Sequence, residues 1–247
     1  MEVRVLATRG SVPRESGTRM LVAADAVAGT IGGGHLELRA IAAARRRLAA
    51  GEAAPQDESI ALGPGLGQCC GGALVLRTQR LGPSTLAAWP AHAPRFVLQL
   101  YGAGHVGRAI VRLLEGIDCR VQWIDERESE FPQAASPPHI ERVCVEPVEA
   151  EVALAPSGAA YLVLTHSHDL DLRITEAIVR RGDFGYLGLI GSETKRARFV
   201  HRLQARGSDA AALARMTCPI GVAGIAGKEP EVIAVAVVAQ LLQLAAR

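Results

Sequence analysis

Apolar runs alternate with helical patterns in the second part of the chain. The first run, 96–101, is followed by a glycine turn, an amphipathic segment and a second run at 119–125. Two more runs, 159–166 and 184–192, are each followed by helical spacing, and the apolar segment 229–245 predicts a last helix. Strands that alternate with helices predict a parallel, doubly wound sheet.

The first part of the chain has a different pattern. Two strand-like runs and a turn precede a glycine-opened helix over residues 29–48. Residues 85–95 contain two prolines and little periodicity, which is typical of a linker between domains. We therefore predict a small N-terminal α+β domain over residues 1–94, followed by a Rossmann-like doubly wound parallel sheet domain over residues 95–247.

The hexapeptide GAGHVG places Gly102, Gly104 and Gly107 in the GxGxxG spacing of dinucleotide-binding folds. It follows one apolar run, begins a helix and leads to a second run that ends at Asp125. Gly102 lets the chain turn, Gly104 lets backbone approach a phosphate, and Gly107 lets the helix pack on the strand. Asp125 is then placed to accept hydrogen bonds from a ribose or another hydroxyl pair. The alternative is a Rossmann scaffold whose ligand has been lost or changed.

Two other predicted strand ends carry polar side chains. Ser192 ends one run and Lys195 lies in the first turn of the next helix, which suits a second phosphate site; an exposed basic helix face is the alternative. His166 ends another run, where it would contact a ligand or cap the helix, and Asp169 is the expected N-cap of the helix that follows. The spacing around His166 departs from the HxHxDH pattern, so no preformed hydrolase-type metal site is predicted.

Composition narrows the class of protein. The 247 residues carry a formal net charge of +2, which is too small for a general nucleic-acid or membrane-binding surface. The sequence shows neither a leader-like start nor an apolar run of about 18 residues, so we expect a cytoplasmic protein. The five cysteines lack the spacing of a zinc module, and Cys119 and Cys144 lie in apolar runs that predict burial in the core.

Two adjacent cysteines, Cys69 and Cys70, lie in the glycine-rich segment 62–72. Glycines contribute little packing and suit a chain that approaches a ligand, so we expect this loop to display its thiols. In a reducing compartment, exposed cysteines more often do chemistry or bind metal than form disulfides. The alternative is a strained turn in which the two cysteines only fill space.

Seven motifs occur in order along nearly the whole chain: GSVPRESGTRMLV, GTIGGGHLE, LGQCCGG, GAGHVG, THSHDLDL, YLGLIGSETKRARF and CPIGVAGIAGKEPEVIAVAVVAQLL. Together they resemble the XdhC/CoxI family of xanthine dehydrogenase accessory proteins. The resemblance implies a chaperone for the molybdenum cofactor (molybdopterin) rather than a turnover enzyme. Such a chaperone would aid cofactor sulfuration with a cysteine desulfurase and insert the cofactor into a xanthine dehydrogenase-type apoenzyme. The resemblance also suggests a homodimer.

The resemblance further implies which residues line a cofactor cleft. Cys69 and Cys70 would hold the metal or a transient sulfide, because thiolate binds soft metals, and Gln68 would donate or accept a hydrogen bond. The other cofactor-binding residues, including those of the glycine fingerprint and the strand ends, are predicted to be Ser11, Arg14, Gly32, Gly33, Gly34, Glu37, Gly102, Gly104, His105, Gly107, Asp125, His166, Ser192 and Lys195. The alternative function is an NAD(P)-dependent oxidoreductase built on GAGHVG, which leaves the motifs GTIGGG and QCCGG without a role.

Overall fold

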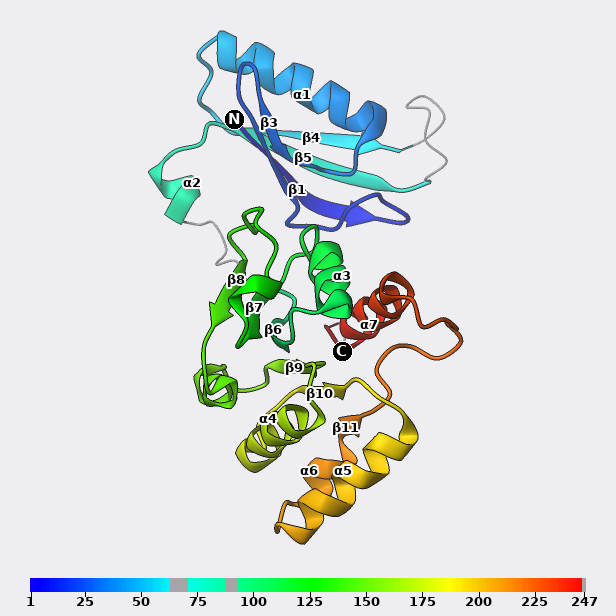
Figure 1. Ribbon diagram of the computed structural model, residues 1–247. Coiled ribbons are helices and arrows are strands. Elements are labelled where there is room, and N and C mark those ends of the chain that lie inside the picture. The colour runs from blue at the N-terminus through cyan, green and yellow to red at the C-terminus, as the bar shows by residue number, and fades with distance from the viewer. Residues whose placement is uncertain (63–70, 88–92, 246–247) are drawn as a thin grey trace. The chain divides into compact units, whose positions relative to one another are not determined.

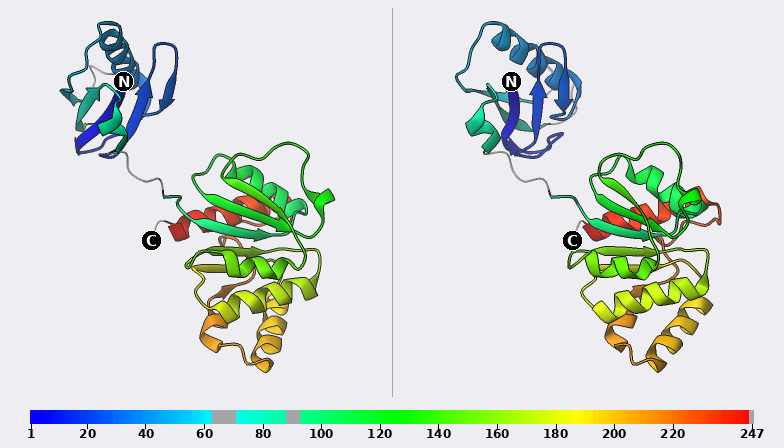
Figure 2. Two further views of the ribbon diagram at one scale, coloured as in Figure 1. Left: turned by 90° about the vertical axis from the view of Figure 1, so that its left-hand side faces the viewer. Right: turned by 60° about the vertical axis from the view of Figure 1, so that its left-hand side comes forward.

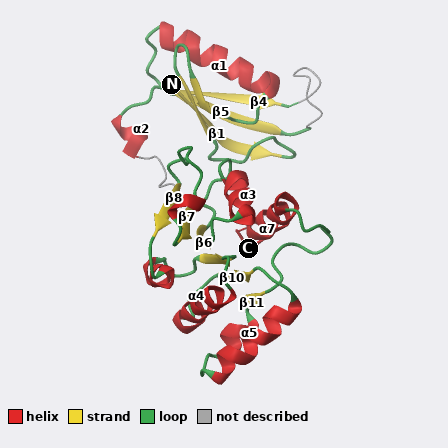
Figure 3. Ribbon diagram, in the orientation of Figure 1, coloured by secondary structure: helices red, strands yellow, loops and turns green. Residues whose placement is uncertain are grey.

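The chain divides into two compact units. The computed structural model describes residues 1–62, 71–87 and 93–245 (Figure 1). The units are Met1–Ala91, called the N-terminal unit, and His92–Arg247, called the C-terminal unit. Both units combine helices with a β-sheet (Figure 3).

The N-terminal unit is an antiparallel sheet with one long helix along a face. Its strands follow the order β3-β2-β1-β5-β4. Its elements are β1 (Glu2–Arg9), β2 (Arg19–Val22), β3 (Val27–Gly29), α1 (Gly34–Ala49), β4 (Gln56–Ala61), β5 (Ala73–Gln79) and α2 (Pro83–Ala87).

Hydrophobic periodicity explains how α1 packs on this sheet. Leu36, Ala40 and Ala44 recur every four residues along α1 and are buried. Val3 and Val5 point to one face of β1, because successive side chains of a strand alternate between faces, and both are fully buried. The helix and the strand therefore share one apolar core.

The C-terminal unit contains a six-stranded sheet in the order β11-β10-β9-β6-β7-β8, and each pair of neighbouring strands is parallel. Counted along this unit, that order is the 3-2-1-4-5-6 arrangement of dinucleotide-binding folds. The strands are β6 (Val97–Tyr101), β7 (Arg120–Asp125), β8 (Ile140–Cys144), β9 (Ala160–Val163), β10 (Tyr186–Leu189) and β11 (Met216–Thr217). The helices are α3 (His105–Leu114), η2 (Glu128–Glu130), η3 (Val148–Leu154), α4 (His168–Arg181), α5 (Glu193–Ala205), α6 (Ala210–Ala214) and α7 (Pro230–Ala245).

Helices cover both faces of the parallel sheet (Figure 2). One apolar cluster joins the sheet to α3 and α7, and a second joins it to α4, α5 and η3. The four residues of β9 are all buried, as are those of β10, which explains the continuous apolar runs of these strands. The predicted fold class, an α+β unit followed by a Rossmann-like doubly wound unit, is confirmed.

One cysteine prediction is wrong. Cys119 is buried as expected, whereas Cys144 is exposed. Cys144 ends β8, the outermost strand of the sheet, so its apolar run has a neighbouring strand on one side only. Among the described helices, none is long and apolar enough to cross a membrane.

Candidate functional site

The loops after β6 and β9 leave the sheet where its strand order reverses. Tyr101 at the end of β6 pairs with Val163 at the end of β9, so the two chains diverge from neighbouring positions. The chain continues into the glycine loop 102–104 after β6 and through Leu164 to Thr165 after β9. Open α/β sheets bind ligands at this point, outside the carboxyl ends of the strands.

The three fingerprint glycines have different surroundings. Gly102 has a φ of 122°, and a Cβ added there would lie closer than 3.0 Å to the carbonyl oxygen of Leu164. A Cβ on Gly107 would approach the carbonyl oxygen of Gly102 equally closely, so these two positions need glycine for the fold itself. A Cβ on Gly104 would meet nothing within 4 Å. Gly104 therefore leaves space above the loop that the protein does not fill.

The helix that follows this loop starts without a side-chain cap. Ser167, Ser192 and Asp209 cap α4, α5 and α6 with side-chain oxygens. The N-cap residue of α3 is Gly104, which makes no side-chain cap hydrogen bond. The first N–H groups of α3 and its positive dipole end are thus suited to an external anion. His105, the first residue of α3, is exposed at the same place.

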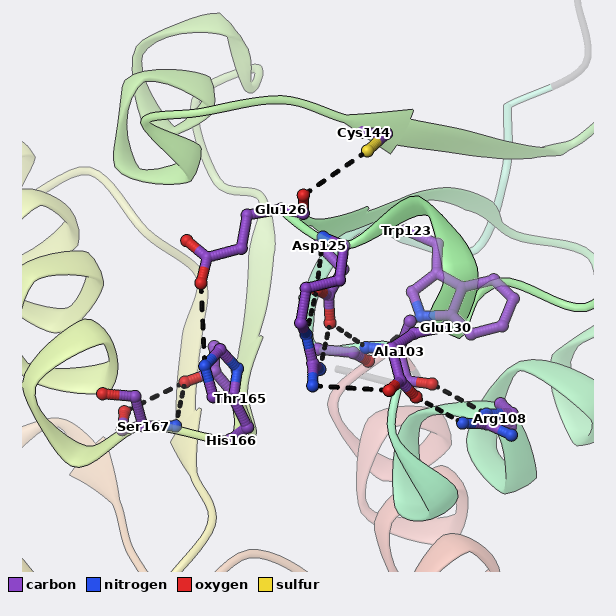
Figure 4. A network of polar contacts seen from close by, with 12 residues as sticks. Ala103, Arg108, Trp123, Asp125, Glu126, Glu130, Cys144, Thr165, His166 and Ser167 are labelled. Atoms are coloured by element: carbon purple, nitrogen blue, oxygen red, sulfur yellow. Dashed lines mark hydrogen bonds and ion pairs between the residues drawn. The ribbon is translucent and has the colours of Figure 1, made fainter.

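Both oxygens of the Asp125 carboxylate accept hydrogen bonds from within the protein (Figure 4). Oδ2 accepts from the N–H of Ala103 at 2.7 Å and from Nη2 of Arg127 at 3.0 Å. Oδ1 accepts from the N–H and the Nε of Arg127 at 2.9 and 3.0 Å. Burial acts to raise the pKa of Asp125, but the hydrogen bonds from Arg127 and Ala103 hold that pKa below its ordinary value. Asp125 is thus a charged residue that ties the glycine loop to the end of β7.

A second carboxylate links Arg127 to helix α3. Nη1 of Arg127 lies 3.4 Å from Oε1 of Glu130, and Nη2 of Arg108 lies 2.5 Å from Oε2 of the same residue. Arg108 also donates from Nε to the carbonyl oxygen of Ala103 at 2.8 Å. The network fixes the backbone of the glycine loop from both sides (Figure 4).

His166 follows β9 and lies beside the end of β7. Its Nε2 is 3.6 Å from Oε1 of Glu126, and its side chain is 43% exposed. The thiol of Cys144 lies 3.7 Å from the carbonyl oxygen of Glu126, so Glu126 contacts residues at the ends of both β8 and β9 (Figure 4). His166 and the glycine loop therefore lie at the same edge of the sheet, at the carboxyl ends of β9 and β6.

Lys195 does not extend into solvent as a phosphate ligand would. Its Nζ lies 2.6 Å from Oδ2 of Asp171 and donates to the carbonyl oxygen of Ile190 at 2.8 Å. The other oxygen of Asp171 accepts from the N–H and the hydroxyl of Thr165 at 2.9 and 2.7 Å. Lys195 and Asp171 are both buried. This ion pair joins the chain after β9 to the chain after β10.

The predicted cap of α4 is also corrected. The helix begins at His168, its N-cap is Ser167, and the Ser167 hydroxyl accepts from the N–H of Leu170. Asp169 lies within the first turn and is exposed, so it is not the cap. Ser192 has the equivalent role for α5, where its hydroxyl accepts from the N–H of Lys195 at 3.3 Å.

In the N-terminal unit, glycine-bearing loops gather at one end of the sheet. The segment 10–18 follows β1, the segment 30–33 follows β3, and Gly72 immediately precedes β5. A Cβ on Gly72 would lie closer than 3.0 Å to the carbonyl oxygen of Ser11, so the first and third of these segments are in close contact. A Cβ on Gly32 would meet Pro13 at 2.6 Å, which places the second segment against the first.

Glu37 holds the loop that opens α1. Its Oε2 accepts from the Thr30 hydroxyl at 2.5 Å and from the N–H groups of Ile31 and Gly33 at 2.9 and 3.0 Å. Gly32, Gly33 and Gly34 all have positive φ, which explains three consecutive glycines. The hydrogen bond from Thr30 is the main cause that lowers the pKa of Glu37 below its ordinary value. The amides of this loop thus surround the protein's own carboxylate.

The structure brings several predicted residues together within each unit. Ser11 and Arg14 are exposed on the segment beside the glycine loop that Glu37 holds. Gln68, Cys69 and Cys70 lie outside the described residues, in the segment between Leu62 and Gly71. Leu62, on the near side of that segment, donates its N–H to the carbonyl oxygen of Gly72 at 2.8 Å.

The sequence does not reveal the partners of three predicted charged residues. Glu37 accepts from Thr30, and Asp125 accepts from Arg127. Lys195 binds Asp171, which also accepts from Thr165. The one available signal was local: Arg127 follows Asp125 by two residues, directly after a predicted strand. The other contacts join residues whose proximity depends on the folded chain.

Comparisons with known proteins agree with this architecture. The model of the XdhC Rossmann domain matches residues 98–241, and that of the XdhC and CoxI family matches residues 2–57. The Escherichia coli (strain K12) protein named "Uncharacterized protein YqeB" is 32% identical over 251 residues, which cover 98% of this chain and 42% of that protein. This chain therefore spans less than half the length of that relative. A crystal structure of a protein named a xanthine dehydrogenase from Bacillus halodurans has a TM-score of 0.78 at 19% identity and covers 98% of this chain and 90% of that one.

Proposed function

Because the chain belongs to the XdhC/CoxI family, we propose that it is an accessory protein that carries the molybdenum cofactor to a xanthine dehydrogenase-type apoenzyme. The cofactor is a pterin with a dithiolene that holds the metal and a terminal phosphate. A carrier for it needs an anion site, hydrogen-bonding groups for a polar ring, and soft ligands near the metal. The cofactor is cargo here, received and passed on without being consumed.

The observation that carries this proposal is the glycine loop before α3. The first turn of α3 has no side-chain cap, and the space above Gly104 is empty of protein within 4 Å of an added Cβ. A phosphate there would accept from the free N–H groups at the positive end of the helix. His105 and His166 are both exposed and are proposed to contact the rest of the ligand.

We propose that Cys69 and Cys70 bind the metal end of the cofactor. Thiolates are soft ligands and can carry sulfur as a persulfide, which suits a role in cofactor sulfuration. The flanking residues support this assignment, since Gly72 contacts the exposed segment that contains Ser11 and Arg14. A cysteine desulfurase as sulfur donor and a homodimeric state belong to the same proposal.

Loading with cofactor tests the proposal directly. The full chain, produced together with the enzymes of cofactor synthesis, is purified and oxidised, and the released pterin is measured by its fluorescence. We expect bound pterin in the wild type and a loss of several-fold or more in a Cys69→Ser, Cys70→Ser variant of unchanged thermal stability. Cys144→Ser is the matched control, because it removes an exposed thiol from the other unit.

Two results would contradict the proposal. Wild-type protein without pterin would show that the chain is not a carrier of this cofactor. Equal pterin content in the double-serine variant and the control would remove the role of Cys69 and Cys70. The homodimer is tested separately by light scattering, and a monomer mass at high protein concentration would exclude it.

A further inference from the structure

We propose that Arg127 determines ligand specificity by occupying the carboxylate with which a dinucleotide-binding fold would hold a ribose. The C-terminal unit would then accept a phosphate ester that places no ribose diol on Asp125, and it would reject NAD(H) and NADP(H). That the accepted ligand is a phosphate ester rests on the proposed function. The rejection of the ribose rests on the side chains around Asp125 alone.

The Asp125 carboxylate has no hydrogen-bonding capacity left. Two carboxylate oxygens offer about four acceptor sites. Arg127 fills three of them, through its N–H, Nε and Nη2, and the N–H of Ala103 fills the fourth. A ribose diol has to donate to this same carboxylate. It can do so only after the guanidinium of Arg127 has left.

The guanidinium is held in its position by more than Asp125. Nη1 of Arg127 also contacts Glu130, and Glu130 binds Arg108 of helix α3. Arg108 in turn donates to Ala103 of the glycine loop. Moving Arg127 would therefore break a connected set of charged hydrogen bonds and remove the cation that compensates a carboxylate whose side chain is only 3% exposed.

The charges around Arg127 also disfavour a 2′-phosphate. An arginine after the second strand can bind that phosphate in NADP-dependent folds. Here three carboxylates lie beside the guanidinium in the sequence or in space: Asp125, Glu126 and Glu130. These three carboxylates outnumber the two cations Arg127 and Arg108, so a phosphate brought to this position would meet a net negative charge and be repelled.

A gain of function tests the inference. The full chain is titrated with NADH and with NADPH, followed by nucleotide fluorescence, in the wild type and in Arg127→Ala and Arg127→Gln. We expect negligible binding to the wild type and NADH binding at least about tenfold tighter in Arg127→Ala, since a charged hydrogen-bond acceptor becomes free. Arg127→Gln keeps a long polar side chain without the bidentate charge and should give a smaller gain.

Two further variants sharpen the result. Arg180→Ala removes an arginine whose side chain is 77% exposed and forms a surface ion pair with Glu176, so this variant should behave as the wild type does. Adding Asp125→Asn to Arg127→Ala should abolish the gained NADH binding, because the neutral amide cannot replace the carboxylate toward a diol. Circular dichroism establishes that each variant is folded.

Several outcomes would overturn the inference. Micromolar NADH binding by the wild type would show that Arg127 does not block the site. NADPH binding that is lost in Arg127→Ala would show that Arg127 reads a 2′-phosphate. Folded Arg127 variants that gain no NADH binding, or a gain that survives Asp125→Asn, would also refute it. A chain that never carries pterin would defeat the proposed function instead, and the NADH results would stand.

Discussion

Gly104→Val and Gly107→Ala are expected to separate ligand binding from stability at one loop. The two glycines lie three residues apart, but an added Cβ meets nothing within 4 Å at Gly104 and backbone closer than 3.0 Å at Gly107. Gly104 has a φ of −69° and a ψ of −171°, which residues with a side chain adopt without strain. The first substitution should therefore disturb only a ligand, and the second only the fold.

The expected magnitudes follow from these surroundings. In Gly107→Ala the helix must move away from the strand end, and such overpacking costs about 1–3 kcal/mol. For a unit of this size that corresponds to a fall in Tm of roughly 2–12 °C. In Gly104→Val the lower entropy of the unfolded chain contributes about 0.4–1 kcal/mol of stability, which offsets the less favourable N-cap residue. Its Tm should change by no more than about 4 °C.

The assay combines thermal unfolding with the pterin content of the purified protein. Gly104→Val should keep the Tm of the wild type, but its pterin content should fall at least about tenfold. The Val side chain fills the space in which a phosphate would accept charged hydrogen bonds, and each of these contributes about 1.5 kcal/mol or more to binding. Gly107→Ala should unfold at a lower temperature. Pterin content equal to that of the wild type in Gly104→Val would refute the reasoning and move the phosphate away from α3. A Gly107→Ala protein as stable as the wild type would show that the helix does not pack as described.

Three other predictions concern internal contacts. Glu37→Gln should lower the free energy of unfolding of the N-terminal unit by about 1 kcal/mol at pH 7. Because the folded state lowers the pKa of Glu37, the difference in Tm between variant and wild type should vanish as the pH falls through that lowered pKa, and a difference that persists in acid would contradict this. Lys195→Met should lower the free energy of unfolding measured in urea by about 3–5 kcal/mol, because it leaves the buried charge of Asp171 uncompensated, and adding Asp171→Asn should recover part of that loss. Equal stability of Lys195→Met and the wild type would rule out a buried ion pair. A thiol reagent should label exposed Cys144 in the native protein and Cys119 only after unfolding, because burial raises the pKa of Cys119 to about 11. Labelling of Cys119 in the native protein, detected by mass spectrometry, would argue against that burial.

The sequence predicts the backbone of the fingerprint better than its side-chain contacts. Gly102 and Gly107 have the predicted roles because their roles depend on local spacing between a strand and a helix. Asp125 lies at the predicted strand end, but its acceptor sites are filled by Arg127, and which donor fills them depends on side-chain geometry. Lys195 lies in the first turn of the predicted helix, but its ammonium group binds Asp171 inside the protein instead of a phosphate.

The remaining errors have equally specific physical causes. The apolar run that ends at Cys144 predicts a strand, but a single strand does not reveal that it will be the edge of its sheet. Ser167 and Asp169 are both good N-cap residues two positions apart, and the extended backbone of Ser167 decides between them. The sequence does not predict strand β4, because its first four residues are polar and exposed. Such residues are typical of a strand at the edge of a sheet, which pairs with one other strand only.

The carboxylate of Glu37 accepts hydrogen bonds from the loop amides that an external anion would otherwise bind. Three consecutive glycines with positive φ would otherwise leave this loop with a large conformational entropy. Because Glu37 supplies the negative charge during folding, the loop is already ordered before any cargo arrives. Under the proposed function the protein has to release the cofactor as well as bind it, and a preordered loop would let both steps proceed without refolding. If this end of the N-terminal unit binds the cofactor as proposed, its affinity would then be set by its exposed side chains alone, and a client that binds the cofactor more tightly could take it over.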